Sequence, residues 1–343
     1  MNETLNITTE EPQDAPKGKG KRKWTKPLII LGGIILGIVL LGVSCNPIGG
    51  GPIPPGGDLN EDHIAVLHVE GVISAESTGS LMGGSNSYNH EFLLSTIEEA
   101  KHNDQNKGIM LYVNTPGGSV YESDELYLKI KEYQQETGRP VYTYMAAMAA
   151  SGGYYISAPT DKIIANRNTW TGSIGVTIGT IYDVTGLMEK YGIKAVTIDS
   201  GANKSMGSIT QPMTPEQQEI FQGLVNEAYE QFVSIVAEGR SLSVDQVKTL
   251  ADGRIYTAKQ AMEVGLVDEI ATFGEAKEKM IEDYGLGQCN FYDFQPQEMG
   301  LLETLMSTAS QLNAGSGGDI QSLMQLMNKK GDFPIAYMSD WTK

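Results

Sequence analysis

The chain has 343 residues and a formal net charge of −17, from 25 basic and 42 acidic side chains. This acidic balance argues against nucleic acid as a partner, because a phosphate backbone is bound by clustered cations. The two cysteines, Cys45 and Cys289, are too few for a disulfide framework.

The N-terminal segment predicts a single membrane anchor. Residues 1–26 form a basic tail, and residues 27–44 follow without a charge. The uncharged stretch is close to the minimum of about 17–25 residues that a transmembrane helix needs. Because cations stay on the cytoplasmic side, we expect a single-pass protein of the cell membrane with a cytoplasmic N-terminus and an extracytoplasmic catalytic domain. A lipidated Cys45, after cleavage of a signal peptide, is the alternative.

The remaining chain divides into a linker, a domain and a tail. Residues 45–60 are rich in Pro and Gly and predict an extended linker. Residues 61–285 alternate between strand-like and helix-like segments. The expected strands are Ile64–Val69, Gly108–Val113, Val141–Met145, Lys162–Ala165, Val176–Tyr182 and Ala195–Ile198. The expected helices are Glu91–His102, Val120–Glu136, Ser151–Ala158, Thr214–Arg240, Ser243–Ala251 and Thr257–Val264. This order predicts an α/β fold with a mostly parallel sheet covered by helices.

Residues 286–343 form a C-terminal tail without a clear helical or strand period. The tail ends in an apolar, strand-like run, Phe333–Met338. Such a run can lie in a groove that binds extended hydrophobic peptides. The alternative is an edge strand or a loosely held end, which is common at chain termini.

Ser151 is the strongest candidate for a reacting group. It follows a run of small residues that begins at Ala146, and two glycines come directly after it. A second glycine pair, Gly117 and Gly118, follows the strand-like run upstream, and its backbone N–H groups suit a developing oxyanion. Together these segments predict acyl transfer from a serine.

A serine nucleophile needs a neighbouring base to take its proton. The chain has four histidines, all before the serine, and each fits an ordinary surface or core role; they are His63, His68, His90 and His102. The other candidate is Lys204, in a loop of small residues, because Ser-Lys hydrolases use a lysine as the base. The alternative is that Lys204 is an ordinary loop lysine whose charged amine is solvated.

Four stretches together resemble the signal peptide peptidase A family, which are membrane-anchored Ser-Lys proteases with the Clp/crotonase fold. The resemblance covers about residues 61–285 and rests on the order and spacing of Val113–Ser119, Met148–Ile156, Thr171–Val176 and Asp252–Glu269. The sequence departs from the family pattern at Ser208–Thr214, just after the lysine loop, which leaves the path of that loop open.

The resemblance implies that Ser151 is the nucleophile, Lys204 the general base and Ser173 the residue that orients the lysine. It implies an oxyanion hole from the backbone of Gly118 and Gly152. It also implies endoproteolysis of hydrophobic peptides, chiefly released signal peptides, by a homo-oligomer that needs no metal or cofactor. Lys204 would act on its own subunit or on a neighbouring one.

Substrate contacts are expected from Gly117, Met145 and Met148, because the Met/Ala run beside the serine suits adaptable apolar pockets. The same run is also compatible with ordinary core packing. Two other classes of function remain. One is a coenzyme-A enzyme of the crotonase type, and the other is a catalytically silent membrane scaffold with the same fold.

Overall fold

The computed structural model describes residues 59–75, 88–287, 289–296 and 336–338. The expected anchor and most of the expected linker lie outside these residues, as does most of the tail. Within the described residues, no helix combines the length and the apolar composition that a membrane crossing requires.

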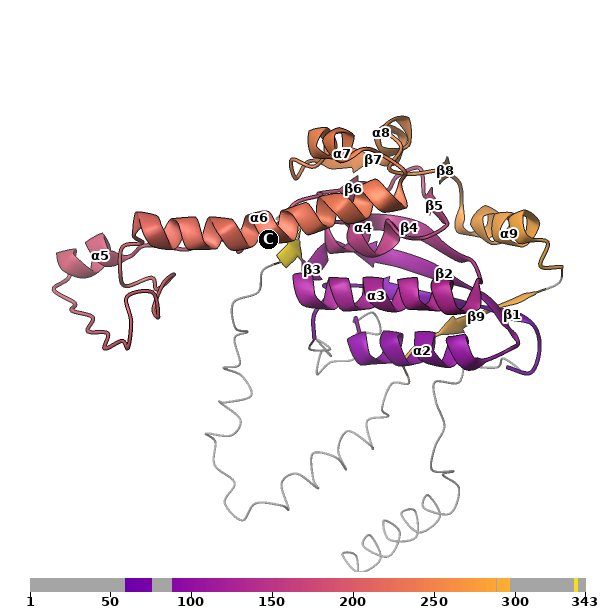
Figure 1. Ribbon diagram of the computed structural model, residues 1–343, viewed down its shortest axis with the longest axis horizontal. Coiled ribbons are helices and arrows are strands. Elements are labelled where there is room, and N and C mark those ends of the chain that lie inside the picture. Colours follow the sequence, from indigo (N-terminus) through magenta and orange to yellow (C-terminus); the bar gives the residue numbers. More distant parts are fainter. Residues whose placement is uncertain (1–58, 76–87, 288, 297–335, 339–343) are drawn as a thin grey trace, which may run out of the picture. The chain divides into compact units, whose positions relative to one another are not determined.

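A mostly parallel sheet forms the centre of the described chain (Figure 1). Its main path runs in the order β7-β6-β4-β2-β1-β9, and β5 and β8 branch from β4. The strands are β1 His63–Glu70, β2 Asn106–Thr115, β4 Val141–Ala150, β5 Lys162–Ala165, β6 Trp170–Gly172, β7 Ile255–Thr257, β8 Glu269–Ile270 and β9 Asn290–Phe294. All neighbours in this sheet are parallel except β6 and β7. The expected α/β class and parallel sheet are therefore confirmed.

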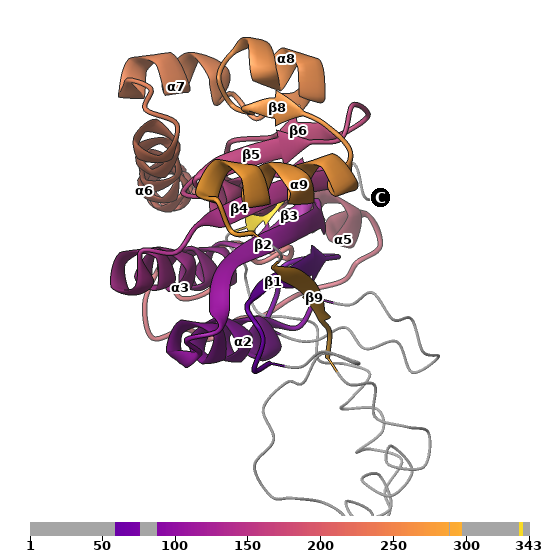
Figure 2. The same ribbon diagram turned by 90° about the vertical axis from the view of Figure 1, so that its right-hand side faces the viewer.

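The three central strands are apolar on both faces, as is usual for parallel strands that helices cover on each side. One face packs on α2 His90–His102, α3 Val120–Thr137, α4 Gly152–Ser157 and the second half of α6 Pro215–Gly239. The other face packs on α9 Phe273–Tyr284, through Ala276 and Met280. Figure 2 shows this layering, with α9 on the opposite side of the sheet from α2 and α3.

One edge of strand β4 pairs with β2, and two shorter strands share the other edge, which positions the later site. Residues Tyr142–Met145 pair with β5, whereas Met148–Ala150 pair with β6. The last pair, Ala150 with Gly172, ends directly before Ser151. The end of β4 and the end of β6 are thereby fixed side by side.

Residues 177–227, which we call the arm, extend away from the sheet. They include α5 Thr185–Lys190 and the first half of α6 (Figure 1). Thr214 caps α6 with a capping box and Pro215 follows at the first helical turn, as the sequence predicted. The short helices α7 Val244–Leu250 and α8 Ala258–Glu263 follow α6.

Two expected strands are wrong. Residues 176–182 and 195–198 form no strand, and both belong to the segment that leaves the sheet. Val196 is 84% exposed and Ile198 is 94% exposed, so their apolar alternation is not explained by burial in this chain. An alternating pattern predicts a strand only where a partner edge is available.

Several elements were not predicted from the sequence. They are β3 Gly117–Ser119, β6, β8, α5, α9 and β9. Strand β9 pairs with β1 through the register His63–Asn290 to Leu67–Phe294, and it lies after the expected domain end at residue 285. Strand β10, Ala336–Met338, pairs with β3 in a separate two-stranded sheet.

Candidate active site

Ser151 lies at the junction between β4 and α4 in an unusual backbone conformation. Its φ is 54° and its ψ is −115°, which a residue with a side chain rarely adopts. Holding a residue in such a region costs about 1–3 kcal/mol and persists only where the surroundings fix it. Here the Ser151 N–H donates to the Gly172 carbonyl at 2.8 Å, and the N–H groups of Tyr154 and Tyr155 donate to the Ser151 carbonyl.

The Ser151 hydroxyl is buried and has no hydrogen-bond partner among the described residues. The whole residue is 1% exposed. A buried hydroxyl without a partner costs about 1–3 kcal/mol, so such groups are rare and point to a functional demand. The oxygen of Ser151 is therefore available to a group that the described residues do not supply.

Backbone donors lie beside this hydroxyl. The Ile73 N–H donates to the Gly117 carbonyl at 3.0 Å, and the Ser119 N–H donates to the Ile73 carbonyl at 2.9 Å. Because these bonds use the groups on either side of Gly118, the N–H and C=O of Gly118 face the other edge of β3. Gly152 begins α4, so its N–H has no acceptor within the helix.

Both glycines are required by close packing. A Cβ on Gly118 would lie 1.9 Å from the Ile73 carbonyl oxygen. A Cβ on Gly152 would lie 2.5 Å from the Ser123 hydroxyl and 3.2 Å from the Gly118 nitrogen. The second of these distances also places Gly118 against the residue that follows Ser151. The structure thus brings Gly117, Gly118, Ser151 and Gly152 together.

The helix that follows Ser151, α4, is tied to its neighbours by one tyrosine. The Tyr155 hydroxyl donates to Asp124 of α3 at 2.6 Å and accepts from Gln231 of α6 at 2.7 Å. Its ring also packs on Phe232, with ring centroids 5.0 Å apart. These contacts fix α4 against α3 and α6, which limits movement of Ser151.

The two expected methionine contacts differ in their surroundings. Met145 is fully buried and packs in the core between the sheet and its helices. Met148 is half-buried on the other face of β4, where its N–H donates to the Asn114 side chain at 3.3 Å. Only Met148 has surface that a bound molecule can touch.

Ser173 follows β6 directly and also has a positive φ, 49°. Its N–H donates to the Arg254 carbonyl at 2.7 Å, which ties the end of β6 to the turn before β7. Ser173 is buried and follows Gly172, whose carbonyl accepts from the Ser151 N–H. Ser173 is therefore held next to the nucleophile turn.

Lys204 lies elsewhere, in the arm, and its side chain is exposed. The loop around it is tied to the start of α6. The Asn203 side chain donates to Glu216 at 3.2 Å, and Gln217 donates to the Ala202 carbonyl at 3.1 Å. The structure does not bring Lys204 to Ser151 of the same chain.

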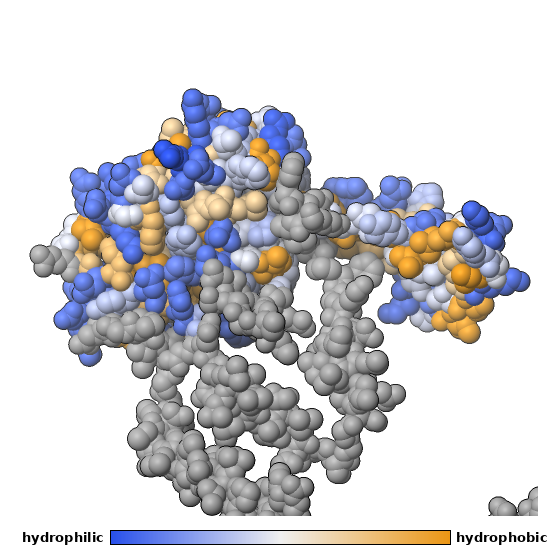
Figure 3. All heavy atoms as spheres, turned by 180° about the vertical axis from the view of Figure 1, so that it is seen from behind, coloured by the Kyte–Doolittle hydropathy of each residue, from blue (hydrophilic) through white to orange (hydrophobic). Residues whose placement is uncertain are grey.

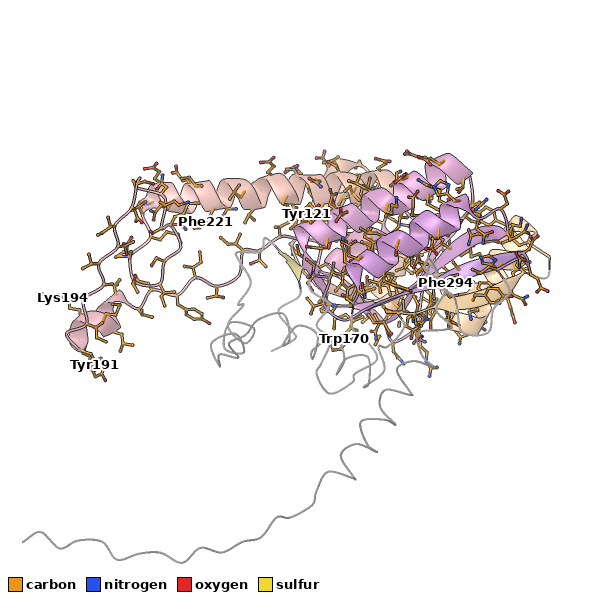
Figure 4. The ribbon with its side chains drawn as sticks, turned by 90° about the horizontal axis from the view of Figure 1, so that it is seen from below. Tyr121, Trp170, Tyr191, Lys194, Phe221 and Phe294 are labelled. Carbon is orange, nitrogen blue, oxygen red and sulfur yellow. The ribbon has the colours of Figure 1, made fainter. Side chains whose placement is uncertain are left out.

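The length of α6 shows how far apart these residues are. Glu216 marks the lysine end of the helix, and Phe232 marks the level at which α6 packs on Tyr155 of α4. Sixteen residues separate the two positions, which corresponds to about 24 Å along a helix axis. A lysine side chain spans only a fraction of that distance. Figure 4 shows the arm extending away from the sheet, with Tyr191 and Lys194 at its far end.

The four histidines have other partners. His68 pairs with Asp293, His102 pairs with Glu98, and His90 lies between Tyr88 and Glu125. His63 contacts the Glu61 carbonyl, and burial lowers its pKa. The described contacts of each histidine thus lead away from Ser151.

Comparison with known proteins identifies the family. Residues 133–287 match the model of peptidase family S49, and residues 72–169 match the Clp protease family. A protein of Enterococcus faecium named as signal peptide peptidase SppA is 39% identical over 237 residues, which are 69% of this chain and 68% of that protein. The chain belongs to the signal peptide peptidase family, S49. The S49 chain also resembles Protease 4 of Haemophilus influenzae, with 37% identity over 71% of this chain and 39% of that protein. It is 32% identical to the chloroplast serine protease SPPA of Arabidopsis thaliana, over 63% of this chain and 31% of that protein.

The tail contributes a short strand beside Gly118 of this S49 peptidase. Strand β10 is antiparallel to β3, with Ala336 opposite Ser119, Tyr337 opposite Gly118 and Met338 opposite Gly117. It therefore pairs with the edge of β3 at which the Gly118 N–H and C=O are available. The sequence expected an apolar strand here, and residues 336–338 agree with that expectation.

Sequence reasoning missed Asn114 and Trp170 at the rim of the site. Asn114 binds the Met148 N–H, and Trp170 is 51% exposed although it begins a strand beside β4. A lone tryptophan among polar and small residues, between Arg167 and Ser173, was the available signal for the second. Among the described residues, no group of three or more His, Cys, Asp or Glu side chains is arranged to hold a metal ion.

Gly118→Ala tests the packing of β3. The added Cβ meets a backbone oxygen that cannot rotate away, so β3 must shift and its N–H must leave the site. We expect peptidase activity to fall by about a hundredfold to a thousandfold, the usual loss for one oxyanion donor. Gly274→Ala is the matched control, because a Cβ there meets nothing within 4 Å. Equal activity of the two variants on a casein substrate would contradict this account of β3.

Proposed function

We propose that this protein is a serine endopeptidase in which Ser151 is the nucleophile and Lys204 is the general base. The observation that carries the proposal is the buried Ser151 hydroxyl, which lacks a partner among the described residues and lies beside the edge of β3 that carries the Gly118 N–H. Ser173 orients the lysine amine, and the N–H groups of Gly118 and Gly152 form the oxyanion hole.

The chemistry follows from these roles. A neutral lysine amine takes the proton as the Ser151 oxygen bonds to the substrate carbonyl carbon. The carbonyl oxygen becomes negatively charged and accepts from the two backbone N–H groups, which need no reorganisation. Collapse of the tetrahedral intermediate breaks the peptide bond, and the departing amine takes the proton from the lysine. Water then hydrolyses the ester through the reverse transfers.

Lys204 is supplied by a second copy of the chain. The arm that carries it cannot return to its own Ser151, because α6 holds the two apart. The arm also exposes more large apolar side chains than a free surface usually carries, namely Tyr182, Leu187, Tyr191, Ile193, Val196, Ile198 and Ile209. Figure 3 shows these hydrophobic atoms gathered on the arm. A neighbouring subunit covers them and receives the lysine, which makes the enzyme a homo-oligomer.

The substrate is an extended, hydrophobic peptide held through its main chain by β3. Main-chain pairing tolerates many side chains, which suits the degradation of varied peptides. Released signal peptides fit this class, and the relative from Enterococcus faecium, which is named as a signal peptide peptidase, supports this choice of substrate. An anchor at residues 27–44 would keep the domain outside the cell membrane, close to where such peptides remain.

Two other functions are less consistent with the site. A coenzyme-A enzyme of the crotonase type uses the same backbone oxyanion hole but has no need of a strained, buried serine. A silent scaffold would have no reason to retain an unpartnered hydroxyl at that position. A fluorophosphonate probe separates the peptidase from both alternatives, since only an activated Ser151 becomes labelled.

Ser151→Ala and Lys204→Ala should each abolish peptidase activity, because nucleophile and base act as a unit. The rate of the unmodified enzyme should rise from neutral to alkaline pH, since only the neutral amine accepts a proton. The measurement is hydrolysis of a signal-peptide substrate, with folding followed by circular dichroism.

Ser95→Ala and Lys259→Ala are controls on exposed helix surfaces and should retain full activity. A Ser151→Ala enzyme that cleaves at the normal rate would rule out this nucleophile. A flat pH profile in folded protein would argue against a lysine base.

Strand β10 occupies the edge of β3 that the peptide needs, so we propose that the tail competes with substrate. Deletion of residues 300–343 should then increase kcat/KM for small peptides, mainly through a lower KM. Deletion of residues 339–343 alone leaves β10 in the chain and should have a smaller effect. If the full chain and the chain without residues 300–343 have identical kinetics and stability, the tail does not compete with substrate.

A further inference from the structure

Met148 and Trp170 form an exposed apolar pair at the carboxyl end of the sheet. They lie opposite each other in the parallel register between β4 and β6. The next pair, Ala149 and Thr171, is fully buried, because successive residues of a strand face opposite sides. Trp170 is 51% exposed and Met148 is half-buried, so this pair leaves apolar surface outside the core. In Figure 4 Trp170 lies at the end of the sheet nearest the arm.

The pair is close to the proposed nucleophile. Trp170 precedes Gly172 by two residues, and the Gly172 carbonyl accepts from the Ser151 N–H at 2.8 Å. Two residues of a strand span about 7 Å, so the indole and the nucleophile turn are neighbours along the sheet edge. On the other side, the Met148 N–H binds Asn114, three residues before Gly117.

The direction of β10 shows which part of a peptide reaches this pair. From Ala336 to Met338 the strand passes Ser119, then Gly118, then Gly117. A peptide bound in the same direction places its scissile carbonyl at the Gly118 N–H. The residues after the scissile bond then continue past Gly117 toward Asn114 and Met148. These residues belong to the leaving fragment.

We propose that Met148 and Trp170 are a specificity subsite for an apolar side chain on the leaving side of the scissile bond. This inference rests on the proposed peptidase function and adds a determinant to it. A rigid indole and a flexible thioether together accommodate aliphatic and aromatic groups. Glu70 lies opposite Asn114 in the register between β1 and β2, so the neighbouring strand carries an acidic rather than a basic residue at this level. The subsite therefore favours apolar residues over acidic ones.

The test uses internally quenched peptides with one common apolar sequence before the scissile bond. In one peptide the second, third and fourth residues after that bond are Phe, and in the other peptide they are Glu. The full-length enzyme should cleave the Phe peptide at least about tenfold faster in kcat/KM, since apolar pockets commonly discriminate by that factor. Trp170→Ala should reduce this ratio to near one, mainly through a higher KM for the Phe peptide. Trp170→Phe should keep most of the preference.

Leu128→Ala is the matched control, because Leu128 is also a large exposed apolar residue but lies on α3 outside the site. It should leave the ratio unchanged. A ratio that survives in Trp170→Ala, or equal cleavage of both peptides by the unmodified enzyme, would overturn the subsite.

A second measurement separates the subsite from the peptidase proposal. Ser151→Ala protein binds fluorescently labelled Phe and Glu peptides without cleaving them, and anisotropy gives both Kd values. Tighter binding of the Phe peptide that is lost in the Ser151→Ala, Trp170→Ala double variant supports the subsite even if Ser151 is not the nucleophile. Equal binding of the two peptides overturns the subsite even if Ser151 is catalytic.

Discussion

The hydrogen bond from the Ser151 N–H to the Gly172 carbonyl holds the turn on which the rest of the site depends. This bond joins the end of β4 to the end of β6 and keeps Ser151 in a backbone conformation that it would otherwise leave. The turn also brings Gly152 against Gly118, so the same turn holds Ser151 and both glycine N–H groups in place. Tyr155 extends that support to α3 and α6. The strain at Ser151 is therefore borne by several elements rather than by one loop.

Helix α6, which supports the Ser151 turn through α4, also holds Lys204 far from Ser151. The second half of α6 packs on α4 through Phe232, whereas its first half holds the Lys204 loop in the arm. A single rigid helix cannot place both ends at one point. In our proposal this geometry makes assembly a condition of activity, because an isolated chain holds an oxyanion hole and a serine but no base. Such an arrangement would protect the cell from a peptidase that is active before it assembles.

The sequence predicted most of the sheet because its strands are local apolar patterns, and Ser151 stays a prediction from an equally local pattern. Lys162–Ala165 and the central apolar runs became strands, and the glycine pairs pointed to the close approach of β3 and α4. The sequence could not predict that Val196 and Ile198 stay exposed on the arm, since their apolar alternation is typical of a half-buried strand. It also missed α9, although the capping box of Thr272 and Glu275 marked its start. This helix packs on the sheet through Phe273, Ala276, Met280 and Ile281. The sequence did not predict strand β9, because β9 pairs with β1, which lies more than 200 residues earlier in the chain.

The central claim is that the nucleophile and the base come from different subunits, and complementation tests it most directly. Ser151→Ala and Lys204→Ala chains with different affinity tags are co-expressed, and assemblies that contain both tags are purified. Random pairing should restore about a quarter of the normal peptidase activity, because each site needs one intact serine and one intact lysine from neighbours. Assemblies of the doubly substituted chain with Lys204→Ala chains should remain inactive. If the purified mixed assembly of the two single variants is folded but inactive, the shared-site account is contradicted.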